Sequence, residues 1–315
     1  MNRSRVPRVP AALGAALGVL IDARWGEPPL DPHPVAAFGS AMQAYERRAY
    51  DGSRAGGVVH AVAGIGLGIG IGRALGPSVV ATTAATALAV AGHGLADAAL
   101  TVGAALEAGD LAAARVALPS LVGRDPSGLD AGAIARAVVE SVAENTVDAV
   151  VAPAYWAALA GAPGALGYRA TNTLDAMVGH RSTRYAEYGW ASARADDVAN
   201  WVPARLTAVL VAAVRPASAV SVARAVRRDA PAHPSPNSGV AEAAFAAALG
   251  LQLGGESRYG ERLEVRPPLG DGTPPAAADI ARSVALAGDV GLALAGLLAA
   301  VGTAQALGRF ARHRR

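Results

Sequence analysis

Two short stretches of the sequence repeat the same polar pattern. The heptapeptides NTVDAVV and NTLDAMV begin at Asn145 and Asn172, and their fourth residues are Asp148 and Asp175. An Asn three positions before an Asp lies on the same side of a helix. Amide and carboxylate oxygens are hard ligands of the kind that Mg²⁺ takes together with phosphate oxygens. The pattern therefore indicates magnesium ligation by Asp148 and Asp175, with Asn145 and Asn172 placed to bind substrate or phosphate.

The first copy closes a row of charged residues spaced four apart, which runs from Arg136 through Glu140 and Glu144 to Asp148. On a helix this spacing forms one stripe, ordinarily a solvated face with ion pairs worth roughly a few tenths of a kcal/mol each. We favour that interpretation for Arg136 and Glu140. Carboxylates at the edge of membrane-like segments are costly unless they have a function. Glu144, Asp148 and Asp175 are therefore candidate catalytic residues.

The polar segment after the second copy adds cations and carboxylates. Arg181 and Arg184 are candidate phosphate ligands, because the guanidinium fork matches phosphate oxygens in a bidentate way. Asp196 and Asp197 follow in the same segment and join the two aspartates of the repeated pattern as candidate magnesium ligands. Carboxylates, amides and arginines in one stretch are typical of a magnesium–phosphate site.

Two proline-rich turns carry further polar groups. In DPHPVAAFG the prolines hold a rigid turn around His33, which is either a substrate ligand or only part of a capped loop. HPSPNSG places Asn237 directly before a predicted helix over 239–250, whose free N–H groups attract anions. Helix capping alone also explains Ser and Asn at such a place. We assign His33 and Asn237 as candidate substrate or phosphate ligands and leave these alternatives open.

The composition excludes several kinds of chemistry. The sequence contains no Lys, so every basic residue other than His is Arg, and it contains no Cys. Without Lys there is neither a P-loop of the Walker type nor a Schiff base for pyridoxal phosphate. Without Cys there are no disulfides, thiolate nucleophiles or Cys-ligated zinc. The net charge of +3 comes from Arg spread along the chain without interleaved aromatics, so no nucleic-acid partner is expected.

The elements that must position these groups are apolar helices. Hydrophobic residues make up 52% of the chain and charged residues 17%, against roughly a quarter charged in soluble domains. The apolar runs cover 57–72, 74–92, 149–167, 202–214 and 290–307. A run at 11–21 would reach only about 17 Å as a helix, so we expect it not to cross the roughly 30 Å of hydrocarbon. We predict an all-α, polytopic membrane protein with about four to five membrane segments and cytoplasmic helical or loop regions.

The glycine-rich stretch GIGLGIGIG lies inside one of these apolar runs. It does not match the dinucleotide-binding pattern G-x-G-x-x-G. Gly64, Gly68 and Gly72 instead match G-x-x-x-G twice. In an apolar helix this spacing produces a face that permits close contact with another helix, so we predict a packing role.

The sequence outside the apolar runs indicates the topology. Helices are expected over 95–118 and 129–148, and 229–280 is expected to be a structured loop region with one helix. Arg clusters lie near the N-terminus, at 224–228 and near the C-terminus, and the positive-inside rule puts all three in the cytoplasm. A chain with both termini in the cytoplasm has an even number of spans, and we favour four.

An ordered series of these motifs resembles the CobD/CbiB family of cobalamin biosynthesis. The matching segments are DPHPVAAFG in the early turn, VGRDPSGLD, and three longer stretches at 138–161, 168–208 and 233–255. The match follows nearly the whole chain, so 1–315 is expected to form a single integral membrane domain of this family. The early turn departs from the family pattern, with Glu27 where Asp is expected, which bears on substrate positioning.

The resemblance implies a multi-pass protein of the cell (inner) membrane with its active site on the cytoplasmic side. It implies an ATP-dependent ligase that joins aminopropanol, or its O-phosphate, to the ring-D propionate of adenosylcobyric acid. ATP with magnesium would be the co-substrate and metal. The partners would be the corrinoid, the amine, membrane lipid and other corrin-assembly enzymes. On this interpretation the two repeated patterns are helix ends that meet at one site.

Two other functions are compatible with the same sequence. A membrane scaffold would hold soluble corrin-assembly enzymes at the bilayer and would tolerate Asn in place of Asp148 and Asp175. A corrinoid transporter would use carboxylates near its spans, would take up substrate into vesicles and would turn over no ATP by itself. The amount of polar sequence outside the spans argues against the transporter.

Overall fold

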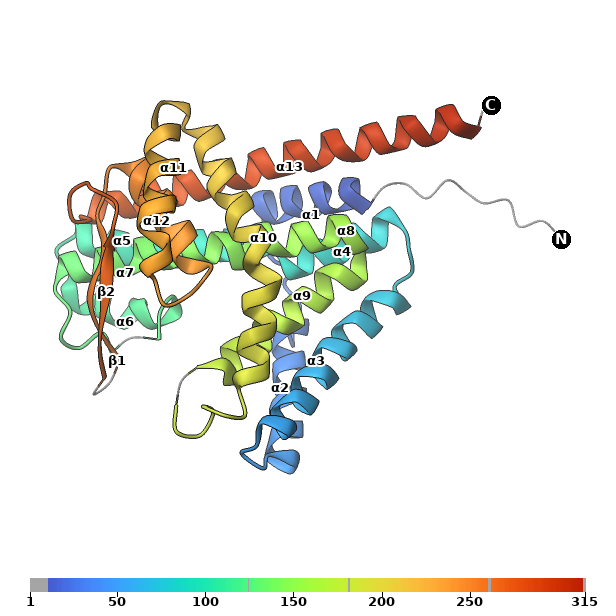
Figure 1. Ribbon diagram of the computed structural model, residues 1–315, viewed down its shortest axis with the longest axis horizontal. Helices are drawn as coiled ribbons and strands as arrows, with labels where there is room; N and C mark the ends of the chain where they lie inside the picture. The colour runs from blue at the N-terminus through green and yellow to red at the C-terminus, as the bar shows by residue number, and fades with distance from the viewer. Residues whose placement is uncertain (1–10, 124, 181, 260–261, 314–315) are drawn as a thin grey trace. The chain divides into compact units, whose positions relative to one another are not determined.

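The computed structural model describes residues 11–123, 125–180, 182–259 and 262–313. These residues are almost entirely helical with one two-stranded hairpin (Figure 1), which confirms the predicted all-α class. The α-helices are α1 (Ala11–Trp25), α2 (Pro34–Ala49), α3 (Arg54–Ala74), α4 (Val79–Ala89), α5 (Gly92–Glu107), α6 (Leu111–Ala117), α7 (Ala131–Thr146), α8 (Ala152–Ala160), α9 (Ala162–Leu174), α10 (Trp190–Val214), α11 (Ala219–Arg228), α12 (Ser238–Leu249) and α13 (Ala277–His313). The remaining elements are the 3₁₀-helices η1 (Leu118–Ser120), η4 (Pro216–Ser218) and η5 (Ala230–Ala232), the π-helices η2 (Val147–Val151) and η3 (Asp175–Gly179), and the strands β1 (Leu253–Tyr259) and β2 (Arg262–Leu269).

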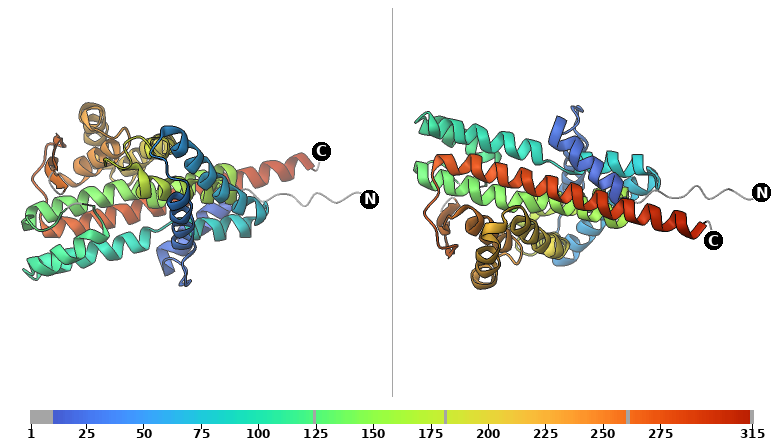
Figure 2. Two further views of the ribbon diagram at one scale, coloured as in Figure 1. Left: turned by 90° about the horizontal axis from the view of Figure 1, so that it is seen from below. Right: turned by 90° about the horizontal axis from the view of Figure 1, so that it is seen from above.

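The described residues form two compact units, each assembled from separate parts of the chain. The described residues of unit 1 lie within Met1–Ala91, Ala152–Asn200 and Leu294–Arg315, and those of unit 2 lie within Gly92–Val151 and Trp201–Ala293. Helices α10 and α13 contribute to both units, and α13 is one continuous helix of 37 residues (Figure 2). Because each unit is discontinuous in sequence, the polar groups inside it come together only through tertiary packing.

Four helical stretches of the described residues are long and apolar enough to cross a membrane. They are Arg54–Ala74, Val79–Glu107, Trp190–Val214 and Ala277–Gly308, with 21, 29, 25 and 32 residues. At about 1.5 Å per residue each reaches the roughly 30 Å of a hydrocarbon core. The protein is therefore a polytopic helical membrane protein, as predicted.

Two of the apolar runs form elements other than those expected. The run 149–167 is not one span, because it is interrupted at Gly161, whose φ of 68° lies in the left-handed region, and at Pro163 in the first turn of α9. The run 202–214 is not a short segment, because it is the second half of α10, which begins in polar sequence at Trp190. Counting apolar residues thus overestimated one helix and underestimated another.

The glycine face of α3 makes the predicted close contact with another helix, and that helix is α9. A Cβ atom at Gly64 would lie 2.7 Å from Cδ1 of Leu174, and one at Gly72 would lie 2.5 Å from the backbone of Pro163. At Gly68 it would lie 2.6 Å from the carbonyl oxygen of Leu166. Side chains at these positions would hold the two helices apart, so the glycines set the close approach within unit 1.

Helix α7 passes through the core of unit 2, and its buried side chains pack against α5 and α12. The expected helix in 229–280 is α12, but this region also contains the antiparallel hairpin of β1 and β2, which the sequence analysis did not predict. The hairpin begins with an irregularity between Leu253 and Gly255, and Gly254 and Gly255 have φ values of 88° and 89°. Glycine tolerates this conformation without strain.

A proline inside α10 is compensated by a side chain from another helix. Pro203 has no N–H to donate to the carbonyl of Ala199, four residues earlier. Trp156 of α8 donates its indole Nε1–H to that oxygen at 3.0 Å. The hydrogen bond ties α8 to α10 at the position where the helix ladder of α10 is interrupted.

Candidate functional site

Both copies of the repeated pattern form the same local structure. In the first, α7 ends at Thr146 and continues as the π-helix Val147–Val151. In the second, α9 ends at Leu174 and continues as the π-helix Asp175–Gly179. Each Asn therefore lies in the last α-helical turn, and each Asp lies in the π-helical turn. Such turns are frequent at functional sites, and the sequence analysis did not foresee them.

Neighbouring residues explain where these turns occur. Pro153 lacks the N–H that an α-helix would direct to the carbonyl of Ala149, so the regular ladder cannot continue through the first copy. After the second copy, His180 is extended, with φ −68° and ψ 142°, and this ends the helix.

Asp175 belongs to a polar cluster of unit 1 centred on Asp196 of α10. Asn172 donates from Nδ2 to Oδ1 of Asp196 at 3.5 Å, and Asn200 donates from Nδ2 to its Oδ2 at 2.9 Å. The hydroxyl of Tyr168 donates to Oδ1 of Asn200 at 2.8 Å. Asp175 is near enough for its charge to act on Asp196. These five residues are called the Asp196 cluster, and it unites three predicted site residues: Asn172, Asp175 and Asp196.

A glycine makes room for the carboxylate of Asp175. A Cβ atom at Gly179 would overlap Oδ1 of Asp175 and would lie 3.5 Å from Cβ of Ala193 on α10. The Asp175 side chain therefore folds back over the end of its own π-helical turn, on the side that faces α10.

The oxygen donors of the Asp196 cluster match the ligands that magnesium takes, which are usually one or two carboxylates together with phosphate oxygens. Asp175 and Asp196 supply the carboxylates. Within the described ranges, no group of three or more His, Cys, Asp and Glu side chains is gathered around a possible metal position. Asp197 forms an ion pair with Arg194, with Oδ2 and Nη1 3.0 Å apart. Magnesium ligation by these aspartates and by Asp148 stays a prediction.

Arg184 takes part in an ion pair within unit 1. Its Nη2 donates to Oε1 of Glu46 on α2 at 3.0 Å, and the hydroxyl of Tyr185 donates to the same oxygen at 2.9 Å. The guanidinium also lies over the ring of Tyr50, 4.0 Å from its centroid. The hydrogen bond to the Glu46 carboxylate raises the pKa of Arg184. This pair fastens the 182–189 loop to α2, and phosphate binding by Arg184 stays a prediction. Arg181 lies outside the described residues.

His33 lies at the N-cap of α2, and its side chain makes no capping hydrogen bond. Its Nε2 is 3.7 Å from Oε2 of Glu27 in the same proline-rich turn. This contact of the imidazole is local, and a role as a substrate ligand stays a prediction.

In unit 2, two predicted site residues have partners distant in sequence. Glu144 accepts a hydrogen bond at Oε1 from the hydroxyl of Ser238 at 2.7 Å. Asn237 accepts one at Oδ1 from Nη1 of Arg205 at 3.0 Å, and its side chain does not cap α12. Capping is thus the wrong interpretation of Asn237. Asn145 donates from Nδ2 at 2.9 Å to a carbonyl one turn earlier in α7.

The sequence analysis missed a buried cluster of ionisable residues in unit 2. Glu242 of α12 is fully buried, and His233 Nε2 and Arg266 Nη1 lie 3.7 and 3.8 Å from its Oε1. Burial lowers the pKa of His233. Glu140 is 2% exposed and accepts the N–H of Gly254 at 3.0 Å, so the expected solvated face of α7 is wrong there. The sequence feature that could have indicated this cluster is the single glutamate inside the otherwise apolar stretch AEAAFAAAL.

The two repeated patterns belong to different units. Asp148 is half-buried in the π-helix of unit 2, whereas Asp175 lies in unit 1. That the two patterns contribute to one site stays a prediction.

Comparisons with known proteins agree on one family. The profile of the CobD/Cbib protein family matches residues 15–287. The chain is 50% identical over 284 residues to the cobalamin biosynthesis protein CobD of Mycobacterium tuberculosis, covering 87% of this chain and 90% of that protein. It is 42% identical over 285 residues to the CobD protein of Pelobacter propionicus, covering 81% and 84%, and 51% identical over 182 residues to that of Rhodobacter capsulatus, covering 58% of each. No solved structure matches the chain significantly. The family profile and the long, highly identical alignments together show that this chain belongs to the CobD/Cbib family.

Proposed function

We propose that the protein acts in cobalamin biosynthesis as an ATP-dependent ligase. It would join aminopropanol, or its O-phosphate, to the ring-D propionate of adenosylcobyric acid and give adenosylcobinamide or its phosphate. Family membership and the names of the relatives support the pathway. The observation that carries the chemistry is the hydrogen bond from Asn172, in the second repeated pattern, to the Asp196 carboxylate of α10. Two carboxylates and an amide are the donor types that a magnesium–nucleotide complex uses.

The reaction has two bond-forming steps. A propionate oxygen attacks the γ-phosphorus of ATP, the bond to the bridging oxygen breaks, and ADP leaves. The amine nitrogen then attacks the acyl carbon, phosphate leaves with the electron pair of the C–O bond, and the nitrogen loses its proton to a base. Asp175 and Asp196 would hold magnesium, which offsets charge on the transferring phosphoryl group.

The remaining candidate residues bind and orient. Arg181 and Arg184 would bind phosphate oxygens through their guanidinium groups. Glu144 and Asp148 would hold the ammonium group, and one of them would accept its proton. Hydrogen bonding to the corrinoid or amine is the proposed role of the remaining polar residues, which are His33, Asn145, Asn172 and Asn237.

We also propose the inner membrane as the location, with the active site on the cytoplasmic side. The four apolar helices support a membrane protein, and ATP is available in the cytoplasm. Membrane lipid and other corrin-assembly enzymes are the proposed partners besides the substrates.

The test is product formation by the purified protein in detergent. Adenosylcobyric acid, aminopropanol phosphate, ATP and magnesium are supplied, and the amide is detected by mass spectrometry. Asp175→Asn and Asp196→Asn should each lower the rate at least about 100-fold. Asp97→Asn is the matched control, since Asp97 is 70% exposed and pairs with His93 one turn earlier in the same helix.

The possible outcomes distinguish the ligase, the scaffold and the transporter. Equal rates in the folded Asp175 and Asp196 variants would reject the Asp196 cluster as the site and keep the ligase. Absence of product from folded wild-type protein would reject the ligase and favour the scaffold. Uptake of corrinoid by vesicles without ATP turnover would instead favour the transporter.

A further inference from the structure

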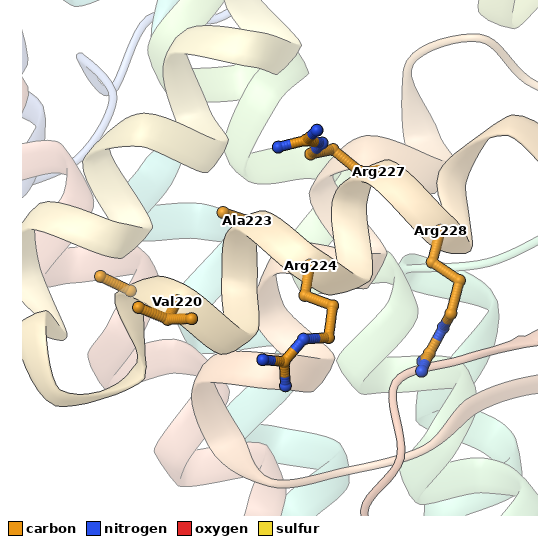
Figure 3. Close-up of a pocket in the computed structure, with 6 residues that line it drawn as sticks. Val220, Ala223, Arg224, Arg227 and Arg228 are labelled. Atoms are coloured by element: carbon orange, nitrogen blue, oxygen red, sulfur yellow. The ribbon is translucent and has the colours of Figure 1, made fainter.

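Helix α11 presents a basic face to the outside of unit 2. Val222 and Ala225 are buried on its inner side, where α11 packs against α12. The outer face carries Val220, Arg224 and Arg227, which are spaced as neighbours on one side of a helix. This face lines an open concavity of about 710 Å³ (Figure 3), whose residues are Ala219, Val220, Ala223, Arg224, Arg227 and Arg228.

Two of the three arginines that line this concavity are not neutralised by the protein. Arg228 pairs with Asp229 and with Asp271, whose Oδ1 is 2.8 Å from its Nη2. Arg224 and Arg227 have no acidic side chain within 4.0 Å in the ranges that the structure describes. In Figure 3 Arg224 and Arg227 extend from α11 in different directions. The face therefore carries two uncompensated positive charges beside Val220, an apolar residue that is 71% exposed.

The position of α11 in the chain places this face beside a membrane span. Four residues separate the end of α10 at Val214 from the start of α11, and the 3₁₀-helix Pro216–Ser218 turns the chain between them. Arg215 is fixed by Asp289 of α13, with Nη2 and Oδ2 2.8 Å apart. Four residues reach at most about 14 Å, so α11 begins within the headgroup region if α10 ends there.

We propose that α11 lies along the membrane surface and that Arg224 and Arg227 bind the phosphates of anionic phospholipids. Arginine is suited to this partner because its fork binds phosphate bidentately. The lipid would also cover Val220, as amphipathic surface helices place apolar side chains at the headgroup boundary. A phosphate ester in solution would satisfy the arginines but would leave Val220 in water.

The experiment uses the absence of native cysteine. Ser221→Cys, exposed beside the basic face, is labelled with a fluorophore, and the full chain is reconstituted in nanodiscs that contain equal amounts of phosphatidylcholine and phosphatidylglycerol. Either phosphatidylglycerol or phosphatidylcholine is brominated at equal mole fraction, and quenching gives the relative association of the two lipids with α11. One arginine at an anionic surface is worth about a fivefold preference, so two give about 25-fold. Arg224→Gln with Arg227→Gln should bring the ratio close to one.

Matched variants and a competitor make the result decisive. Arg47→Gln with Arg48→Gln removes the same charge from the last turn of α2 and should leave the ratio unchanged. A wild-type ratio near one, or a ratio insensitive to Arg224→Gln with Arg227→Gln, would overturn the proposal. Loss of the preference on adding inorganic phosphate at constant ionic strength would also overturn it, because it would identify a site for soluble phosphate.

Discussion

The contact between α3 and α9 can be tested by comparing two substitutions, because α3 carries glycines on two faces. At Gly68, a Cβ atom would lie 2.6 Å from the carbonyl oxygen of Leu166 and 2.8 Å from Cβ of Ala170. At Gly70, two positions further along the same helix, there is nothing within 4 Å. Gly68→Ala and Gly70→Ala are thus the same substitution in the same helix, with and without a clash.

The expected changes in the free energy of unfolding follow from two opposing effects. Alanine is better than glycine in a helix by about 0.5–1 kcal/mol, and both variants gain this amount. Gly68→Ala must also move a backbone carbonyl or separate two helices, and overpacking of this kind costs about 1–3 kcal/mol. The difference in unfolding free energy between the variants should therefore be about 1–3 kcal/mol, with Gly70→Ala the more stable.

Thermal unfolding in detergent, followed by circular dichroism, measures this difference. At about 2–4 °C per kcal/mol for a chain of this general size, Gly68→Ala should unfold about 2–12 °C below Gly70→Ala. Gly70→Ala should unfold at or above the wild-type temperature. Equal temperatures for the two variants, or a lower one for Gly70→Ala, would show that α9 does not pack closely on the glycine face.

Two further predictions concern a hydrogen bond and a buried histidine. Trp156→Phe removes the donor to the carbonyl of Ala199 and should lower the free energy of unfolding by about 1–3 kcal/mol; adding Pro203→Ala should recover part of this, because residue 203 then supplies an N–H to the same oxygen. No recovery in the double variant would contradict the explanation. Burial lowers the pKa of His233 in the folded protein, whereas the pKa of this histidine in the unfolded chain is about 6.5, so the unfolded chain binds a proton more readily than the folded chain. The free energy of unfolding should therefore be highest above about pH 6.5 and should decrease as the pH falls below that value. His233→Gln should reduce this pH dependence, measured by denaturant titrations at several pH values. An unchanged pH dependence in the variant would show that His233 is not its source.

The features predicted correctly from the sequence depend on spacing within one helix. Gly64, Gly68 and Gly72 share a face of α3 whatever that face contacts, because residues four apart are neighbours on a helix. The apolar spans were predicted from the composition of single stretches of the chain, which also does not depend on what they contact. The interruption at Gly161 and Pro163 was also present in the sequence, but a count of apolar residues ignores helix breakers.

Contacts in unit 2 constrain the topology beyond a count of apolar helices. Glu144 of α7 is bonded to Ser238 of α12, although α10 lies between these helices in the sequence. A helix that crosses the bilayer puts its two flanking sequences on opposite sides. If α10 is the one segment that crosses between them, α7 or α12 must therefore enter the membrane as well. The helical run from Ala131 to Ala160, which includes the π-helical turn Val147–Val151, is long enough to do so.

The sequence by itself determined the helical membrane class, the family resemblance, the repeated pattern and the exclusion of lysine and cysteine chemistry. These conclusions rest on composition and residue order, which need no knowledge of packing. The tertiary structure alone decided the partners of the charged groups. Glu46 lies 138 residues from Arg184, Gly254 lies 114 from Glu140, and Arg205 lies 32 from Asn237. Charges and hydrogen bonds act through space, so these partners depend on which helices pack together and not on the local pattern around each residue.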